Sequence, residues 1–312
     1  MSDLKQDGGK SYVLVTAAYN EENFIARTIE SIVAQTVRPT KWIIVSDGST
    51  DKTDSIVDSY SRDHDFLRLH RICDPHPRNF AAQVNAINAG CTLLKGIEFD
   101  FFGNVDADVS FEPDYYERLL AKFDDDPTLG LGGGYIHEEK SGTFVSRGGN
   151  STRAVPHAVQ LFRRACYEMV GPYVPLPYGG PDWLAEIVAR QKGWKVRSFP
   201  ELPVRHYRPT CAADGITRGS YRLGLLDHSL GSDPVFEVLK CLSRVSHSPF
   251  GASALLRLSA FVWASCRRYP LAVPRDVSEC LRAEQRARVR ALFRGKNRRS
   301  SDSHDTFDRI AD

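Results

Sequence analysis

The chain has 312 residues, of which 42% are hydrophobic and 26% are charged. This is the composition of an ordinary soluble protein that can bury one large core, or a core plus an appendage. The formal net charge is only +2, which excludes a molecule that binds polyanions over its whole surface.

The cysteines and the first residues predict a reducing compartment. The 7 cysteines are scattered without a Cys-x-x-Cys pair, which argues against a disulfide framework and against a zinc site. Residues 1–10 are polar and contain no apolar signal core. We therefore expect a cytoplasmic protein whose active site lies in the cytosol.

Strands and helices are expected to alternate over the first part of the chain. Apolar runs predict strands at residues 12–16, 41–45, 66–72 and 99–105, and helical spacing predicts helices at about 22–35, 79–90 and 113–123, with another that ends near residue 60. This alternation predicts an α/β fold with a mostly parallel central sheet and helices on both faces. Ligands of such sheets bind beyond the carboxyl ends of the strands.

The second half of the sequence is less regular. A glycine-rich segment at residues 129–135 precedes expected helices near 163–170 and 181–191 and an expected strand at 195–199, and beyond about residue 210 the pattern is helical. We therefore divide the chain into four parts: a flexible N-terminus (1–10), an α/β domain (11–210), a helical, partly apolar and basic C-terminal extension (211–299) and a disordered tail (300–312).

The first strand is followed by Tyr19-Asn20-Glu21-Glu22. A dinucleotide-binding protein would carry a glycine-rich loop there, and bulky acidic residues would repel a bare phosphate. Acidic side chains can instead accept hydrogen bonds from ribose hydroxyls or base N–H groups. The alternative for Asn20 is a plain helix N-cap.

Two further acidic turns follow strand ends. In Asp47-Gly48-Ser49-Thr50-Asp51 the glycine permits a tight turn, and in Asp106-Ala107-Asp108 two carboxylates can face one cation or divide between a cation and a ribose. Each turn alone has a structural alternative, for example a capped connection between a strand and a helix. Together they favour a site for a hard cation such as Mg²⁺ or Mn²⁺.

These three turns, together with Gly180-Pro181-Asp182-Trp183-Leu184, resemble glycosyltransferase family 2 in their order and spacing, over about residues 11–209. The resemblance implies the GT-A fold and an inverting, nucleotide-sugar-dependent transferase. It also implies the donor site: Tyr19, Glu21 and Asp47 would hold the nucleoside, Asp106 would face the ribose, and Arg78 would lie near the donor.

The resemblance further implies a metal site and a general base. Asp108 would bind the cation that bridges the donor diphosphate, and His206 would add a metal or diphosphate contact. Asp182, at the start of a helix, would remove the proton from the acceptor hydroxyl. Asp182 and His206 each have a structural alternative. Asp182 could be a helix-start carboxylate favoured by the helix dipole, and His206 could be a structural histidine.

The chain departs from the family pattern at two places. Family members often carry Glu-Asp where this chain has Pro181-Asp182, and the processive Gln-x-x-Arg-Trp sequence is replaced by residues 217–222, Thr-Arg-Gly-Ser-Tyr-Arg. The second departure favours transfer of a single sugar over polymer extrusion.

The C-terminal extension has two interpretations. Residues 250–266 form an apolar stretch that is too short to span a bilayer, and residues 267–299 are strongly basic. The stretch and the basic run could form a peripheral anchor on an anionic membrane at the inner face. Alternatively, the apolar helix packs on the catalytic domain and a solvated basic helix follows it.

We therefore expect transfer of a sugar, most simply from a UDP-sugar, to a glycan or lipid-linked acceptor in polysaccharide or cell-envelope synthesis. Nucleic acid is not an expected partner, because the basic run lacks interleaved aromatic residues. Sugar-nucleotide synthesis would require a basic, glycine-rich loop after the first strand, which is absent. The remaining alternative is a non-catalytic sugar-nucleotide-binding or scaffold protein at the membrane surface.

Overall fold

The computed structural model describes residues 10–74, 79–208, 215–243 and 251–296. The expected flexible N-terminus up to residue 9, the expected tail at 300–312 and the expected domain boundary at 210/211 lie outside these ranges. In chain order, the described residues form β1 (Tyr12–Ala18), α1 (Ile25–Val33), β2 (Lys41–Ser46), α2 (Thr53–Asp63), β3 (Leu67–Arg71), α3 (Phe80–Thr92), β4 (Phe101–Asn104), β5 (Val109–Phe111), α4 (Tyr115–Asp125), β6 (Leu129–Lys140), β7 (Thr143–Ser146), the 3₁₀ turn η1 (His157–Val159), β8 (Leu161–Arg163), α5 (Arg164–Val170), α6 (Pro181–Gln191), β9 (Lys195–His206), α7 (Gly215–Ser229), α8 (Pro234–Ser243), α9 (Ala252–Cys266) and α10 (Arg275–Lys296).

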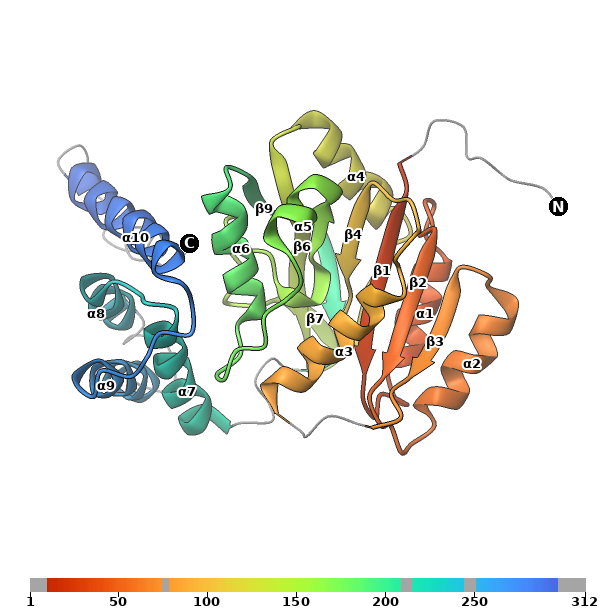
Figure 1. Ribbon diagram of the computed structural model, residues 1–312, viewed down its shortest axis with the longest axis horizontal. Helices are drawn as coiled ribbons and strands as arrows, with labels where there is room; N and C mark the ends of the chain where they lie inside the picture. Colours follow the sequence, from red (N-terminus) through yellow and green to blue (C-terminus); the bar gives the residue numbers. More distant parts are fainter. Residues whose placement is uncertain (1–9, 75–78, 209–214, 244–250, 297–312) are drawn as a thin grey trace.

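The first half of the chain forms the expected parallel part of the sheet. β3, β2, β1 and β4 lie side by side in that order, and each pairs in parallel with its neighbour. Ala18 at the end of β1 lies opposite Ser46 at the end of β2. The polar turns that follow these two strands therefore leave the sheet at the same edge (Figure 1).

The second half adds antiparallel neighbours, so the nine-stranded sheet is mixed. β8 pairs antiparallel with β4 and with β6, while β9 runs parallel to β6 and antiparallel to the short β5. In this last pair Val109 lies opposite His206. The pairing brings the end of β9 next to the Asp-x-Asp turn between β4 and β5.

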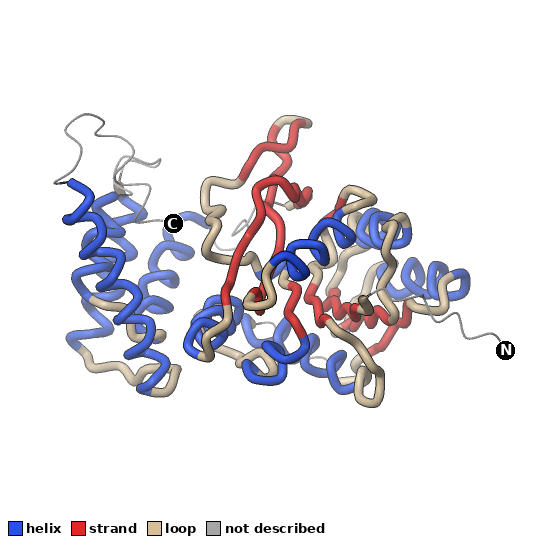
Figure 2. Tube along the Cα trace, turned by 90° about the horizontal axis from the view of Figure 1, so that it is seen from above, coloured by secondary structure: helices blue, strands red, loops and turns tan. Residues whose placement is uncertain are grey.

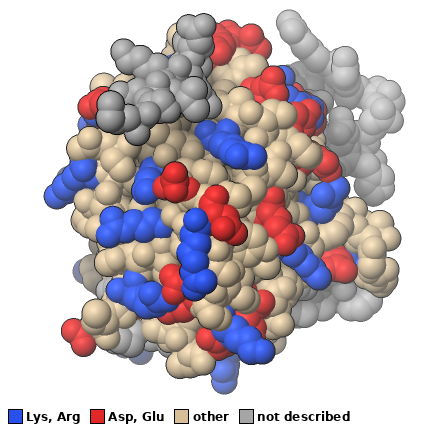
Figure 3. All heavy atoms as spheres, turned by 90° about the vertical axis from the view of Figure 1, so that its right-hand side faces the viewer, with Lys and Arg blue, Asp and Glu red and all other residues tan. Residues whose placement is uncertain are grey.

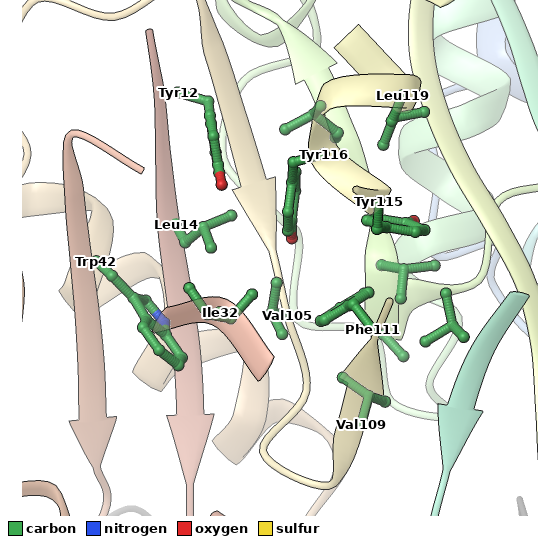
Figure 4. Close-up of a cluster of buried hydrophobic side chains, with 14 of the residues drawn as sticks. Tyr12, Leu14, Ile32, Trp42, Val105, Val109, Phe111, Tyr115, Tyr116 and Leu119 are labelled. Atoms are coloured by element: carbon green, nitrogen blue, oxygen red, sulfur yellow. The ribbon is translucent and has the colours of Figure 1, made fainter. Parts of the chain in front are cut away.

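Hydrophobic side chains alternate along the central strands and build two cores, one on each face of the sheet. Tyr12 and Leu14 contribute to the core under α1, α2 and α4, part of which is drawn in Figure 4. Val13 and Val15 point to the other face and pack with side chains of α3, α5 and α6. This period of two is the pattern expected for strands buried on both faces.

The C-terminal helices form a separate group beside the sheet (Figures 1 and 2). A third core joins them to α6: Leu184 and Ile187 of α6 pack with Leu226 of α7 and Val277 of α10. α7 and α9 approach closely, because a Cβ atom placed on Gly224 of α7 would lie 2.0 Å from a backbone oxygen of α9.

The surface around α2 carries both signs of charge. Figure 3 shows Lys and Arg intermixed with Asp and Glu on this face, and Arg71 pairs there with Asp54 at 2.8 Å. Within the described ranges, no helix combines the length and the apolar character that crossing a bilayer would require.

Candidate active site

The turns after β1 and β2 are joined by hydrogen bonds. Asn20 accepts from the backbone N–H of Thr50 at 2.8 Å, and the backbone N–H of Glu21 donates to Oγ1 of Thr53 at 2.7 Å. Asn20 is not the N-cap of α1, which begins after Phe24; it has a positive φ of 54°, a conformation that asparagine tolerates well. The two acidic turns therefore form one rigid edge.

The Asp-x-Asp turn is held from both faces of the sheet. Oγ1 of Thr28 in α1 donates to the carbonyl oxygen of Ala107 at 2.8 Å. The backbone N–H of Asp106 donates to the carbonyl oxygen of Ala158 at 3.1 Å, and Gln83 of α3 donates to Oδ1 of Asp106 at 3.0 Å. Three separate elements thus fix the positions of the two aspartates.

Asp108 lies at the centre of a charged cluster. His206 Nε2 lies 3.3 Å from its Oδ2, and Arg208 Nε donates to the same oxygen at 2.6 Å. The other end of the Arg208 guanidinium donates to Oε1 of Glu21 at 2.6 Å. One arginine therefore bridges the turn after β1 and the Asp-x-Asp turn.

The pKa values in this cluster are shifted by burial and by neighbouring charges. Burial raises the pKa of Glu21 to about 7 against the opposing charge of Arg208, and the charges of Asp108 and Asp106 add to the rise. Burial also acts to raise the pKa of Asp108, but hydrogen bonds and charges of His206 and Arg208 outweigh it and lower that pKa. Burial acts to lower the pKa of His206, whereas Asp108 raises it above its usual value.

The cluster offers few ligands to a cation, but of a suitable kind. Within the described part of the chain, no three His, Cys, Asp or Glu side chains gather as a metal cage. Asp108 and His206 can supply one oxygen and one nitrogen ligand, and a divalent cation that binds phosphate often takes only one or two carboxylates from the protein. Two buried polar atoms beside it, Glu21 Oε2 and His206 Nδ1, have no hydrogen-bond partner in the described chain. The residues fit a cation that takes its remaining ligands from a diphosphate.

Asp106 faces a partly buried histidine, His157, that the sequence did not single out. His157 Nδ1 lies 3.4 Å from Oδ1 of Asp106, and Asn104 donates to the carbonyl oxygen of His157 at 2.6 Å. Burial lowers the pKa of His157, but its hydrogen bond with Asp106 and the charges of Asp106 and Asp182 outweigh burial and raise it. His157 therefore lies within the electrostatic reach of both aspartates.

Asp182 is the second residue of α6 and is half-buried. Gly180 adopts a positive φ of 81° before the helix, and Pro181 occupies the first turn, where its missing N–H has no cost. Leu226 of α7 packs 3.0 Å from the Cβ position of Gly180. The charge of Asp182 acts on two neighbouring side chains, those of His157 and Glu186.

The remaining residues predicted from the sequence lie in different environments. Asp47 is buried at the end of β2, and its backbone N–H donates to the carbonyl oxygen of Ala18 at 3.0 Å. The Tyr19 side chain is 41% exposed at the end of β1. Arg78 lies outside the described residues. The structure thus brings Glu21, Asp106 and Asp108 together with His206, and it adds Arg208 and His157 to them.

Glu186 lies one turn after Asp182 on the buried side of α6, and burial raises its pKa to about 8. The folded protein then holds a proton that the unfolded chain releases near pH 4.5, so this contribution to stability is present at low pH and is lost as the pH rises through about 8. Glu186→Gln keeps an acceptor for the N–H of Val155, which is bonded at 2.6 Å.

We therefore expect the free energy of unfolding of the unsubstituted protein to fall by about 1–3 kcal/mol more than that of Glu186→Gln between about pH 5 and about pH 8. Urea unfolding of both proteins at several pH values measures the difference. Parallel pH profiles would contradict the shifted pKa.

Comparison with known proteins identifies one family over half of the chain. The model of glycosyl transferase family 2 matches residues 13–172. A putative glycosyltransferase, EpsH of Bacillus subtilis, is 33% identical over 120 residues, which cover 37% of this chain and 31% of that protein. The poly-β-1,6-N-acetyl-D-glucosamine synthase of Staphylococcus aureus is 26% identical over 128 residues, which cover 41% of this chain and 29% of that protein. These matches span only about a third of the relatives' length.

Solved structures extend the likeness over nearly the whole chain. The mannosyltransferase PcManGT of Pyrobaculum calidifontis, in complex with GDP-mannose and Mn²⁺, has a TM-score of 0.55 at 15% identity and covers 97% of this chain and 86% of its own. TarS of S. aureus has a TM-score of 0.53 at 16% identity and covers 96% of this chain and 55% of its own. This likeness confirms the expected GT-A fold.

Proposed function

Because the chain belongs to glycosyl transferase family 2 and is a glycosyltransferase, we propose that it transfers one sugar from a nucleotide-diphosphate donor, most simply a UDP-sugar, to a glycan or lipid-linked acceptor. The observation that carries the proposal is that Asp106 lies against His157 and Asp108 against His206, while the charge of Asp182 also acts on His157. The reaction is direct displacement with inversion, so an α-linked donor yields a β-linked product.

The donor nucleoside binds at the edge where β1 and β2 end. Tyr19 offers an exposed ring for the base, and Asp47 and Glu21 offer acceptors for base N–H groups and ribose hydroxyls. Asp106 is held by Gln83 and His157 with its second oxygen available to the ribose.

Asp108 and His206 would hold Mg²⁺ or Mn²⁺, which would supply positive charge to stabilise the negative charge that develops on a departing nucleoside diphosphate. In the structure, the Arg208 guanidinium donates hydrogen bonds to Asp108 and Glu21. Guanidinium binds both carboxylate and phosphate, so we expect donor binding to move Arg208 from a carboxylate to a phosphate oxygen.

Asp182 acts on the acceptor. Its carboxylate takes the proton of the attacking hydroxyl, and α6 fixes its position through the packing of Leu184 and Ile187. The absence of the Gln-x-x-Arg-Trp sequence at residues 217–222 supports a single transfer. The name of the S. aureus relative, a synthase of poly-β-1,6-N-acetyl-D-glucosamine, supports a role in polysaccharide synthesis.

Thermal unfolding with a panel of nucleotide sugars, with and without Mn²⁺, tests the donor. The cognate donor should raise Tm by about 3–5 °C at roughly a hundredfold excess over Kd, and the rise should require the cation. No cation-dependent shift with any nucleotide sugar would contradict the donor and metal assignments. A shift without release of nucleoside diphosphate in the presence of acceptors would favour the non-catalytic binding protein.

A further inference from the structure

Helix α8 buries its charged side chains and exposes several of its apolar ones. Its two charged residues, Glu237 and Lys240, are 0% and 8% exposed, whereas Val235 and Leu242 on the opposite side are 61% and 58% exposed. A surface helix of a soluble protein normally buries its apolar side chains and exposes its charges. The outer face of α8 therefore presents hydrocarbon to the surroundings.

Helix α9 is reversed in the same way. Its single charged residue, Arg257, is 6% exposed, while Leu255, Val262 and Trp263 are 67%, 47% and 41% exposed. α8 and α9 pack against each other. Neither helix exposes a charged side chain along its described length.

The buried charges explain why the apolar residues face outward. Asp227 of α7 accepts from Lys240 Nζ at 3.0 Å and from Arg257 Nε at 2.6 Å, and Lys240 also donates to Glu237 at 2.5 Å. Ion pairs across α7, α8 and α9 thus occupy the interior of this helical group. Rotating α8 or α9 to hide its exposed leucine would withdraw Lys240 or Arg257 from Asp227. The buried Asp227 carboxylate would then lose a charged partner, which is costly.

One end of the apolar surface carries groups that suit a lipid interface. Trp263 and Tyr269 pack edge to face with centroids 5.0 Å apart, and the Arg267 guanidinium lies 6.0 Å from the Trp263 ring. Arg267 and Arg268 are exposed directly after α9. Tryptophan and tyrosine favour the headgroup region of a bilayer, and arginines beside them attract anionic lipids.

Part of the basic run forms α10, which contacts the rest of the protein. α10 packs on α6 and α8, and several of its arginines are engaged within the protein. Arg282 donates to the carbonyl oxygen of Gly231 at 2.7 Å, and Arg286 pairs with Asp233 at 2.7 Å. The apolar surface of α9 is therefore continued by α8, while these arginines of α10 are engaged within the protein.

We propose that the outer faces of α8 and α9 bind peripherally to an anionic lipid bilayer, with Trp263, Arg267 and Arg268 at the headgroups. Hydrocarbon fits this surface better than a folded protein does, because a protein interface normally carries polar groups that fix the partner by hydrogen bonds. This inference concerns a surface distinct from the donor site, and its failure would leave the proposed reaction untouched.

Sedimentation of the full chain with vesicles tests the surface. The protein should bind vesicles of phosphatidylcholine with phosphatidylglycerol and bind pure phosphatidylcholine less. Leu242→Ser combined with Leu255→Ser should lower the partition coefficient about tenfold or more. The matched control, Met169→Ser combined with Val174→Ser, replaces two side chains that are 55% and 45% exposed on the catalytic domain and should bind as the unsubstituted protein does.

Two further measurements separate the outcomes. Arg267→Gln with Arg268→Gln should lower binding to the anionic vesicles toward the level of pure phosphatidylcholine. Donor binding by all variants should equal that of the unsubstituted protein, which shows that they are folded. Equal vesicle binding by the leucine variant and the unsubstituted protein would overturn the proposal. So would a dimer in solution that the leucine variant fails to form, without vesicle binding by either protein, since the occupant would then be a second copy.

Discussion

Asp182→Asn should bind the donor as the unsubstituted protein does and lose transfer, with kcat lowered about 10²–10⁴-fold. Asparagine preserves the shape of the side chain at the start of α6 but cannot accept the proton of the acceptor hydroxyl. Donor affinity is set at the ends of β1, β2 and β4, which this substitution does not touch. Calorimetry of donor binding and release of nucleoside diphosphate measure the two effects separately.

The structural alternative for Asp182 is a carboxylate that stabilises the helix through its dipole, worth about 0.3–1 kcal/mol. Asp276 provides a matched control, because it is likewise the second residue of its helix, α10, and lies outside the candidate site. Asp276→Asn should lower stability by a similar amount and leave turnover unchanged. Near-normal turnover by Asp182→Asn would refute the role as base and leave only the helix-start role.

The parallel half of the fold could be predicted from local patterns. Strands β1 and β2 are apolar runs, and α1 repeats Ile25, Ile29 and Ile32 at helical spacing. The local pattern of each segment therefore predicts its secondary structure. The carboxyl ends of parallel strands share one edge, which also predicts that the turns holding Glu21, Asp47 and Asp108 lie near one another. These inferences need no knowledge of distant contacts.

The antiparallel half could not be predicted in this way. The segment expected only as glycine-rich is strand β6, where a Cβ atom on Gly134 would lie 2.1 Å from the carbonyl oxygen of Leu202 in β9. Glycine is required there by a close approach of two strands that are far apart in the sequence. Periodicity within a window contains no signal for that approach.

The same limit applies to the candidate site. Arg208 contacts Asp108 across 100 residues of chain and Glu21 across 187 residues, and the pairing of β9 with β5 and β6 brings these residues together. His157 belongs to η1, which lies between β7 and β8 in the chain, and η1 places it beside Asp106. The reversed faces of α8 and α9 are hidden for a related reason, because periodicity reveals that a helix has two faces but not which one is buried.

Asp108→Ala should abolish the cation-dependent part of donor binding, with UDP affinity in the presence of Mn²⁺ lowered about 100-fold or more. The carboxylate is the only oxygen ligand that the chain is proposed to give the cation, so a substituted site keeps only the His206 nitrogen. Calorimetry with UDP, with and without Mn²⁺, reads this effect without any need for turnover.

Removal of Asp108 also leaves Arg208 and His206 without their shared partner, so folding needs a separate control. Asp108→Asn keeps the shape and still accepts a hydrogen bond from Arg208, and it should lose the Mn²⁺ dependence while keeping a cooperative unfolding transition. Glu112→Gln breaks the pair of Glu112 with Arg205 beside the same two strands and should bind UDP and Mn²⁺ normally. If Asp108→Asn retains cation-dependent affinity, Asp108 does not bind the metal, and its place in the cluster is to hold Arg208 against Glu21.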